Sequence, residues 1–182
     1  MKKTLRLFND QDIPYMLTGS VVSSIQGEPR LTHDIDIIIH CNNRILKVLH
    51  DNFDERQYYF DDDTVKEAIS SIGMFNLIEI ESGDKIDFWL LSDSAFDESR
   101  FQRKIRVTLF GEHAWISSTE DTILAKMLWS KNSGGSEKQF NDALRVYEIN
   151  ADTINLAYIE HWSSQLNVEE YWHRLLQRAL LE

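Results

Sequence analysis

The chain has 182 residues, which fits one domain or one domain with an appended segment. An apolar content of 42% and a charged content of 27% are ordinary for a globular protein, and a formal net charge of −11 argues against a protein that binds duplex DNA through a basic face. The single cysteine, Cys41, cannot form an internal disulfide, polar residues interrupt any signal-peptide core, and no apolar run approaches the roughly 20 residues of a transmembrane helix. We therefore expect a cytoplasmic protein with neither a membrane nor duplex DNA as partner.

The first part of the chain is predicted to alternate helices and strands. Apolar periodicity and turn residues predict a helix, a strand, a helix and a strand in turn, over Lys3–Gln11, Tyr15–Thr18, Gly19–Gln26 and Asp34–Ile39. Ser20 has the chemistry of a helix N-cap, and Gly27 has that of a C-cap. The apolar run Ile37–Ile39 is typical of a strand buried inside a sheet.

The middle of the chain continues in the same manner. Asn42 or Asn43 is expected to cap the next helix, and the acidic run Asp61–Asp63 favours a solvated turn in which Asp63 caps the helix after it. The elements expected here are helices over Arg44–Asp51 and Thr64–Ser71, hairpin strands over Met74–Ile80 and Lys85–Leu91, a helical turn over Phe96–Gln102, and strands over Arg103–Leu109 and His113–Ile116.

The pattern changes near residue 118, after which almost everything is predicted to be helical. Ser118 or Thr119 followed by acidic residues is a typical helix start. Four helices are expected, over Thr119–Ser130, Ser136–Ile149, Thr153–Gln165 and Val168–Leu181. We therefore predict an α+β fold, with a small mixed sheet flanked by helices in residues 1–117 and a helical C-terminal segment in residues 118–182 packed on it.

Three aspartates are the candidate catalytic and metal-binding residues. Side chains alternate along a strand, so Asp34 and Asp36 share one face. Because two like charges so close together repel each other, the simplest explanation for their placement is a divalent cation between them. Asp87 lies in an apolar strand and needs a partner there. If its strand lies beside that of Asp34 and Asp36, the three form a triad. The alternatives are an exposed strand edge for the first two, and for Asp87 an ion pair with Lys85 or with an arginine of residues 103–106.

The turn at Gly19–Ser20 complements these acids. Free backbone N–H groups at a helix start favour an anion, and a glycine lets the chain approach a phosphate closely. Magnesium prefers oxygen ligands and is often completed by substrate phosphates. A strand-to-helix turn with a capping serine is the alternative for this pair alone.

The motif Leu17–Ser20, thirteen residues, and then Asp34–Ile37 resembles the signature of the DNA polymerase β-like nucleotidyltransferase superfamily. In that superfamily a Gly-Ser turn precedes two acids on one strand, and a third acid lies alone on a later strand. The segment Ile86–Phe88, with Asp87 at its centre, matches this third position.

Two later segments extend the resemblance toward the small bacterial members of the abortive-infection and toxin type. Ser118–Lys126 resembles the helix that follows their catalytic domain, where a lysine, here Lys126, approaches the nucleotide phosphates. Glu137–Asp142 resembles the second helix of the abortive-infection type toxins, whose aspartate maps to Asp142. The alternatives are a solvated Lys126 and an Asp142 that pairs with Lys138 or Arg145 at helical spacing.

The resemblance implies an enzyme that moves a nucleoside monophosphate from a nucleoside triphosphate to an acceptor hydroxyl with release of pyrophosphate. The three aspartates would hold Mg²⁺, or Mn²⁺ in its place, and Asp87 would also orient or deprotonate the acceptor. Gly19, Ser20 and Lys126 would bind the nucleotide. The acceptor class stays open among small molecules, proteins and tRNA.

Two other functions remain open at this stage. One is a non-catalytic module that binds nucleotides or proteins with the same fold. The other is a tRNA-modifying toxin of a toxin–antitoxin pair. The protein partners to consider are accordingly an antitoxin or a second copy of the chain.

Overall fold

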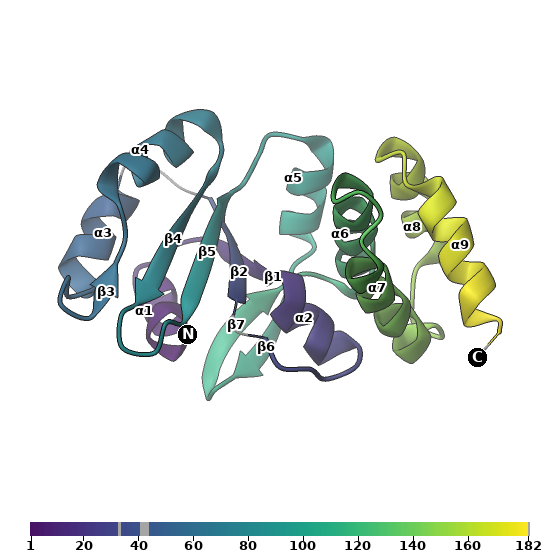
Figure 1. Ribbon diagram of the computed structural model, residues 1–182, viewed down its shortest axis with the longest axis horizontal. Helices are drawn as coiled ribbons and strands as arrows, with labels where there is room; N and C mark the ends of the chain where they lie inside the picture. Colours follow the sequence, from purple (N-terminus) through teal and green to yellow (C-terminus); the bar gives the residue numbers. More distant parts are fainter. Residues whose placement is uncertain (33, 41–43, 182) are drawn as a thin grey trace. The chain divides into compact units, whose positions relative to one another are not determined.

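The computed structural model describes residues 1–32, 34–40 and 44–181. The predictions for Cys41, Asn42 and Asn43 lie outside the described residues. Within these ranges the elements follow the order in Figure 1: α1 (Lys2–Asp10), β1 (Tyr15–Thr18), α2 (Gly19–Gln26), β2 (Asp34–Ile39), α3 (Ile45–Asn52), β3 (Tyr58–Tyr59), α4 (Asp62–Ser71), β4 (Met74–Glu79), β5 (Lys85–Leu90), α5 (Ala95–Gln102), β6 (Ile105–Leu109), β7 (Glu112–Ile116), α6 (Thr119–Asn132), α7 (Glu137–Asn150), α8 (Leu156–Gln165) and α9 (Glu169–Ala179).

The chain divides into two compact units. The sheet unit comprises Met1–Thr18 and Thr32–Ile116, and the helical unit comprises Gly19–Leu31 and Ser117–Glu182. The helical unit thus includes α2, an early segment that is far from α6–α9 in sequence. No helix in the described ranges has both the length and the apolar composition needed to cross a membrane.

All strands belong to one mixed sheet in the sheet unit, in the order β3-β4-β5-β2-β1-β7-β6. β1 pairs with β2 in antiparallel fashion, whereas β2 pairs with β5 and β1 with β7 in parallel fashion. β4 and β5 form the expected hairpin. The predicted α+β fold with a small mixed sheet flanked by helices is confirmed.

The two faces of the sheet are packed differently. On one face Phe88 lies between Phe8 of α1 and Phe75 of β4, with ring centroids 5.7 and 5.0 Å away. On the other face Met16 and Ile38 form a smaller cluster with Phe101 of α5. The register continues this second face, two residues further along β1 and β2, to Thr18 and Asp36. The candidate acids therefore begin where this smaller apolar cluster ends.

In the helical unit, α2 lies close to α7. A Cβ atom on Gly27 would come within 2.9 Å of the Ser23 carbonyl oxygen and 3.0 Å of Val146, so this position needs a glycine because of close packing. Within α7 and α9, Tyr147 and Trp172 contact each other edge to face at 5.5 Å. These contacts join an early helix and the C-terminal helices around one core.

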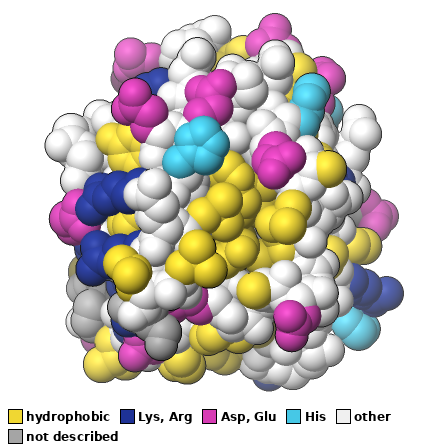
Figure 2. Space-filling view, turned by 90° about the vertical axis from the view of Figure 1, so that its right-hand side faces the viewer, with side chains coloured by type: hydrophobic (Ala, Val, Ile, Leu, Met, Phe, Trp, Pro, Cys, Tyr) yellow, Lys and Arg dark blue, Asp and Glu magenta, His cyan; other side chains and the backbone are white. Residues whose placement is uncertain are grey.

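Part of the apolar surface of the helical unit stays open to solvent. Figure 2 shows hydrophobic side chains gathered on the side where Figure 1 has α8 and α9, bordered by acidic and histidine side chains. Exposed apolar residues of this unit include Trp129, Leu156 and Leu180.

Several local predictions need correction. Asp61 rather than Asp63 caps α4, because Asp61 has an extended backbone and its carboxylate accepts from the N–H of Thr64 at 2.7 Å. Helix α2 begins at Gly19, so Ser20 lies inside the first turn and is not the N-cap. The two-residue strand β3 was not predicted, since its aromatic side chains lie in an acidic stretch without alternation. Ser118 does cap α6, as predicted.

Candidate functional site

The pairing of β2 with β5 brings the three candidate aspartates to one face of the sheet. Asp36 lies directly opposite Asp87, and Asp34 lies opposite Lys85. Residues two apart on a strand share a face, so all four side chains belong to the same side. The strand adjacency that the triad requires is therefore present. We call these four residues the carboxylate face.

Asp87 is held on both of its oxygens. The Nζ atom of Lys85 lies 3.0 Å from Oδ2, and the side-chain amide of Asn76, the residue opposite on β4, donates to Oδ1. Asp87 is only 8% exposed. The pKa of Lys85 is raised above its usual value, first by its hydrogen bond with Asp87 and further by the charges of Asp87, Asp34 and Asp36. The ion pair with Lys85 that the sequence offered as an alternative is thus present.

The other two aspartates are more open. The indole N–H of Trp89 donates to Oδ1 of Asp36 at 3.2 Å. The side chain of Asp34 is 65% exposed, and its Oδ1 lies 4.0 Å from Nζ of Lys85. The ammonium of Lys85 therefore lies near both Asp87 and Asp34.

The carboxylate face matches a divalent cation in its chemistry. Its donors are carboxylate oxygens, the ligands that Mg²⁺ and Mn²⁺ prefer, and it already accommodates a positive group, the ammonium of Lys85. As they stand, however, no three His, Cys, Asp or Glu side chains among the described residues are grouped closely enough to hold a metal ion. A cation would have to take the place of Lys85 beside Asp87.

Gly19 and Ser20 belong to the helical unit, at the start of α2. Gly19 has φ of +67°, a left-handed conformation that a glycine adopts without strain. The Ser20 hydroxyl accepts from Nη2 of Arg30 at 2.8 Å, and its carbonyl accepts from the hydroxyl of Ser24 at 2.8 Å. The start of α2 thus combines the left-handed backbone of Gly19 with a hydrogen bond from the Arg30 guanidinium to Ser20.

Lys126 and Asp142 also belong to the helical unit, and with Arg30 they form what we call the charged cluster. Lys126 is 5% exposed, and its Nζ donates to Oδ2 of Asp142 at 2.8 Å and to Oε1 of Gln139 at 2.7 Å. Arg30 donates two hydrogen bonds to the same carboxylate, from Nε at 3.1 Å and from Nη2 at 2.8 Å. The lysine is therefore buried rather than solvated.

The charged cluster alters the acidity of Asp142. Burial by itself would raise the pKa of this carboxyl, but the hydrogen bonds and charges of Arg30 and Lys126 outweigh it and hold the pKa below its ordinary value. The alternative of a pair at helical spacing, with Lys138 or Arg145, is wrong: the ion pairs of Asp142 are with Arg30 and Lys126. Arg30 was missed because it is 112 residues away in sequence.

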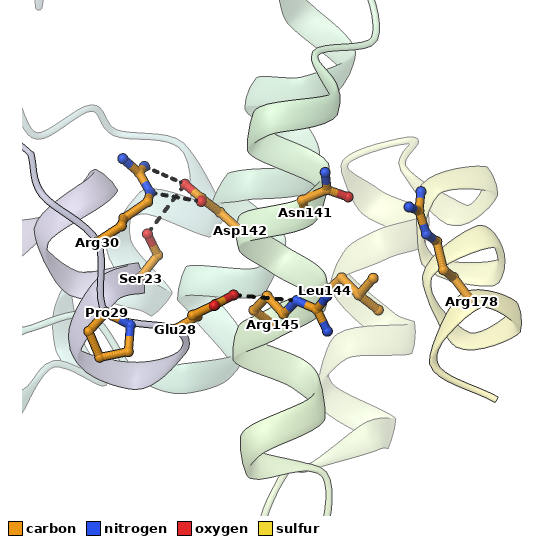
Figure 3. Close-up of a pocket in the computed structure, with 9 residues that line it drawn as sticks. All are labelled: Ser23, Glu28, Pro29, Arg30, Asn141, Asp142, Leu144, Arg145 and Arg178. Carbon is orange, nitrogen blue, oxygen red and sulfur yellow. Dashed lines mark hydrogen bonds and ion pairs between the residues drawn. The ribbon is translucent and has the colours of Figure 1, made fainter. Parts of the chain in front are cut away.

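A pocket of about 410 Å³ borders the charged cluster (Figure 3). Its basic residues have acidic neighbours: Arg145 lies 3.6 Å from Glu28, and Arg178 lies 3.7 Å from Glu137. The charged side chains that line the pocket are thus paired. Its lining comprises Ser23, Glu28, Pro29, Arg30, Asn141, Asp142, Leu144, Arg145 and Arg178.

No protein-family model matches the chain, and no curated protein matches it in sequence. Among solved structures, an antigenic nucleotidyltransferase-like protein from Paracoccidioides brasiliensis matches with a TM-score of 0.60 and 16% identity, over 96% of this chain and 84% of that one. ANT(2'')-Ia in complex with adenylyl-2''-tobramycin matches with a TM-score of 0.60 and 11% identity, over 93% of this chain and 95% of that one. The chain has a nucleotidyltransferase-like fold. The lincosamide antibiotic adenylyltransferase LnuA, in its lincomycin-bound form, matches with a TM-score of 0.54 and 17% identity, over 80% of this chain and 93% of that one.

Proposed function

We propose that this chain is a nucleotidyltransferase that moves a nucleoside monophosphate from a nucleoside triphosphate to an acceptor hydroxyl. The observation that carries the proposal is the β2–β5 register, which sets Asp36 opposite Asp87 with Asp34 on the same face. It occurs in a nucleotidyltransferase-like fold, two of whose solved relatives are named as an adenylyltransferase and as a protein bound to an adenylylated antibiotic.

In the proposed reaction the acceptor oxygen forms a bond to the α-phosphorus of the triphosphate, and the bond from that phosphorus to the bridging oxygen breaks. Pyrophosphate leaves. A divalent cation, Mg²⁺ or Mn²⁺, held by Asp34, Asp36 and Asp87 would supply charge neutralisation to the phosphates. Asp87 would also orient or deprotonate the acceptor hydroxyl, while Asn76 keeps its Oδ1 in place.

The nucleotide-binding residues of the proposal lie at the start of α2 and on α6. Gly19 follows Thr18 in the chain, and Thr18 is the partner of Asp36 in the sheet. The backbone N–H groups at this helix start suit a phosphate. Lys126 is included because of the family resemblance, and a phosphate would have to share its ammonium with Asp142 and Gln139.

One observation favours a second candidate function, a nucleotide-binding or interaction module without catalysis. Both oxygens of Asp87 are taken by side chains of the protein itself, Lys85 and Asn76. A face locked in this arrangement would bind no cation and transfer nothing. The proposal of an enzyme therefore requires that Lys85 can leave Asp87.

A transfer assay separates the two. The protein is incubated with Mg²⁺ and each α-labelled nucleoside triphosphate, together with an aminoglycoside, a lincosamide, bulk tRNA or a protein mixture. We expect label on one acceptor class and release of pyrophosphate. Transfer to tRNA alone would favour the function of a tRNA-modifying toxin.

The matched variants are Asp36→Ala and Asp10→Ala, the second an exposed aspartate of the same unit. We expect Asp36→Ala to abolish transfer, with a thermal midpoint equal to or above that of the wild type because repulsion is relieved. Asp10→Ala should transfer normally. Full activity in Asp36→Ala would end the proposal, and triphosphate binding without transfer to any acceptor would favour the non-catalytic module.

A further inference from the structure

Lys85 belongs to the carboxylate face by its position in the sheet. It lies opposite Asp34 in the β2–β5 register and two residues before Asp87 on β5, so its side chain projects on the same side as the acids. Its Nζ lies 3.0 Å from Oδ2 of Asp87 and 4.0 Å from Oδ1 of Asp34. The ammonium therefore lies within a few ångströms of two carboxylates that the proposed function assigns to a divalent cation.

We propose that Lys85 is a resident counter-ion of the carboxylate face, which offsets part of its negative charge when no metal is bound and is displaced from Asp87 when a divalent cation enters. The inference rests on the proposed function. Lys85 then acts as a specificity-determining residue: it weakens binding of the bare cation, and it favours entry of a cation together with a triphosphate, whose negative charge can receive the released ammonium.

The two partners of Asp87 contact different oxygens of its carboxylate. Asn76 donates to Oδ1 from the neighbouring strand β4, whereas Lys85 contacts Oδ2. When Lys85 withdraws, Oδ2 becomes available and the amide still orients the carboxylate. Exchange of the ammonium for a cation at Oδ2 therefore does not require the loss of the Asn76 hydrogen bond.

The exposures agree with this division. The side chain of Asp87 is 11% exposed, whereas that of Lys85 is 36% exposed. A lysine carries its charge on a flexible stem of four carbons, so its ammonium can turn toward water or a phosphate while the aspartate remains in place. The mobile member of the pair is therefore Lys85.

The test is the affinity of the whole chain for Mn²⁺ alone, without nucleotide. It is measured by titration calorimetry and by the loss of the electron paramagnetic resonance signal of free Mn²⁺. Lys85→Gln removes the positive charge and keeps a polar side chain. We expect it to bind Mn²⁺ on the order of 10-fold more tightly than the wild type. Its thermal midpoint without metal should fall, and added Mn²⁺ should raise that midpoint more than it does in the wild type.

Two further variants control for charge and for folding. Lys66→Gln removes the same charge from an exposed lysine that pairs with Asp63 in the same unit, and it should leave Mn²⁺ affinity near that of the wild type. Lys85→Arg keeps the charge, so its affinity should also stay near the wild-type value. A tighter Lys85→Arg would overturn the charge argument even if Lys85→Gln folded poorly.

The remaining outcomes separate this inference from the proposed function. If Asp36→Ala abolishes Mn²⁺ binding in the wild-type background but Lys85→Gln binds no more tightly than Lys66→Gln, the counter-ion role of Lys85 is wrong and the metal site stands. If Lys85→Gln binds more weakly, Lys85 supports the cation and the inference is likewise wrong. If Mn²⁺ binding survives Asp36→Ala, or is absent from every variant, the proposed metal site itself fails.

Discussion

The carboxylate face and the charged cluster are both built from aspartate and lysine, yet they combine these residues in opposite proportions. The carboxylate face consists of three aspartates and one lysine, whose ammonium lies near Asp87 and Asp34. The charged cluster has one aspartate, Asp142, whose carboxylate pairs with both Arg30 and Lys126. One ammonium is thus shared between carboxylates in the first set, and one carboxylate is shared between two basic groups in the second.

The two sets also differ in how firmly the charges are held. The lysine of the charged cluster has a side chain 6% exposed, and its aspartate is 12% exposed. On the carboxylate face Asp87 is as buried, at 11%, but its partner Lys85 and the neighbouring Asp34 are 36% and 65% exposed. Buried pairs are costly to break, whereas partly exposed ones are worth little to stability. We infer that substitutions in the charged cluster mainly affect folding, and that those on the carboxylate face mainly affect chemistry.

The largest expected effect is that of Asp87→Asn on nucleotide transfer. The amide keeps the shape of the side chain but cannot accept the proton or bind a cation strongly, so kcat should fall on the order of 10³-fold. The free energy of unfolding should change by no more than about 1 kcal/mol, since the lost partner, Lys85, can reach water. Single-turnover rates and urea titrations measure the two quantities. If Asp87→Asn were strongly destabilised while its folded fraction stayed fully active, Asp87 would contribute to folding and not to chemistry, opposite to what we infer for the carboxylate face.

The next effect is that of Asp142→Asn on stability. It leaves Arg30 and the buried ammonium of Lys126 without their carboxylate, and breaking a buried pair in this way costs about 3–5 kcal/mol. Urea denaturation would measure the loss, with Asp152→Asn, an exposed aspartate of the same unit, as the control that should stay near the wild type. If both variants were equally stable, the charged cluster would contribute nothing to folding.

The lowered pKa of Asp142 predicts a smaller effect of acid. A carboxyl whose folded-state pKa lies below its unfolded value of 3.8 contributes stability that is fully present above pH 3.8. That stability is lost as the pH falls from about 4 through the depressed folded-state pKa. Urea titrations between pH 6 and the acid limit of folding should show a shallower pH dependence in Asp142→Asn than in the wild type. Parallel curves would mean that this carboxyl is not the group responsible.

Sequence reasoning succeeded where the signal was local. Alternation along Asp34–Ile39 and Lys85–Leu91 predicted both strands to within a residue, and the turn between the β4 and β5 segments predicted their hairpin. It also singled out the three aspartates as candidates, because a charge in an apolar strand stands out against its neighbours, whereas the pairing of β2 with β5 that places them on one face entered only as a condition. The confirmed α+β fold follows from these same local patterns.

What the sequence could not indicate depends on contacts between distant segments. The partner of Asp142 is Arg30, in a loop that carries no pattern, and the burial of Lys126 results from the packing of α6 with α7. The grouping of Gly19–Leu31 with the C-terminal helices has the same origin. The division into residues 1–117 and 118–182 stays a prediction.

The smallest expected effect is that of Gly19→Ala, and it tests whether the start of α2 does more than turn the chain. Placing an L side chain at φ of +67° costs about 1–2 kcal/mol of stability. Gly134→Ala is a matched control, because Gly134 has φ of +68° and open space around its Cβ position in the same unit. The two variants should lose similar stability in urea. Only Gly19→Ala should also weaken the binding of a magnesium–nucleoside triphosphate complex in calorimetry, because only there would the side chain crowd the backbone N–H groups that face a phosphate. Equal nucleotide affinities in the two variants would reduce Gly19 to a turn residue and remove it from the proposed site.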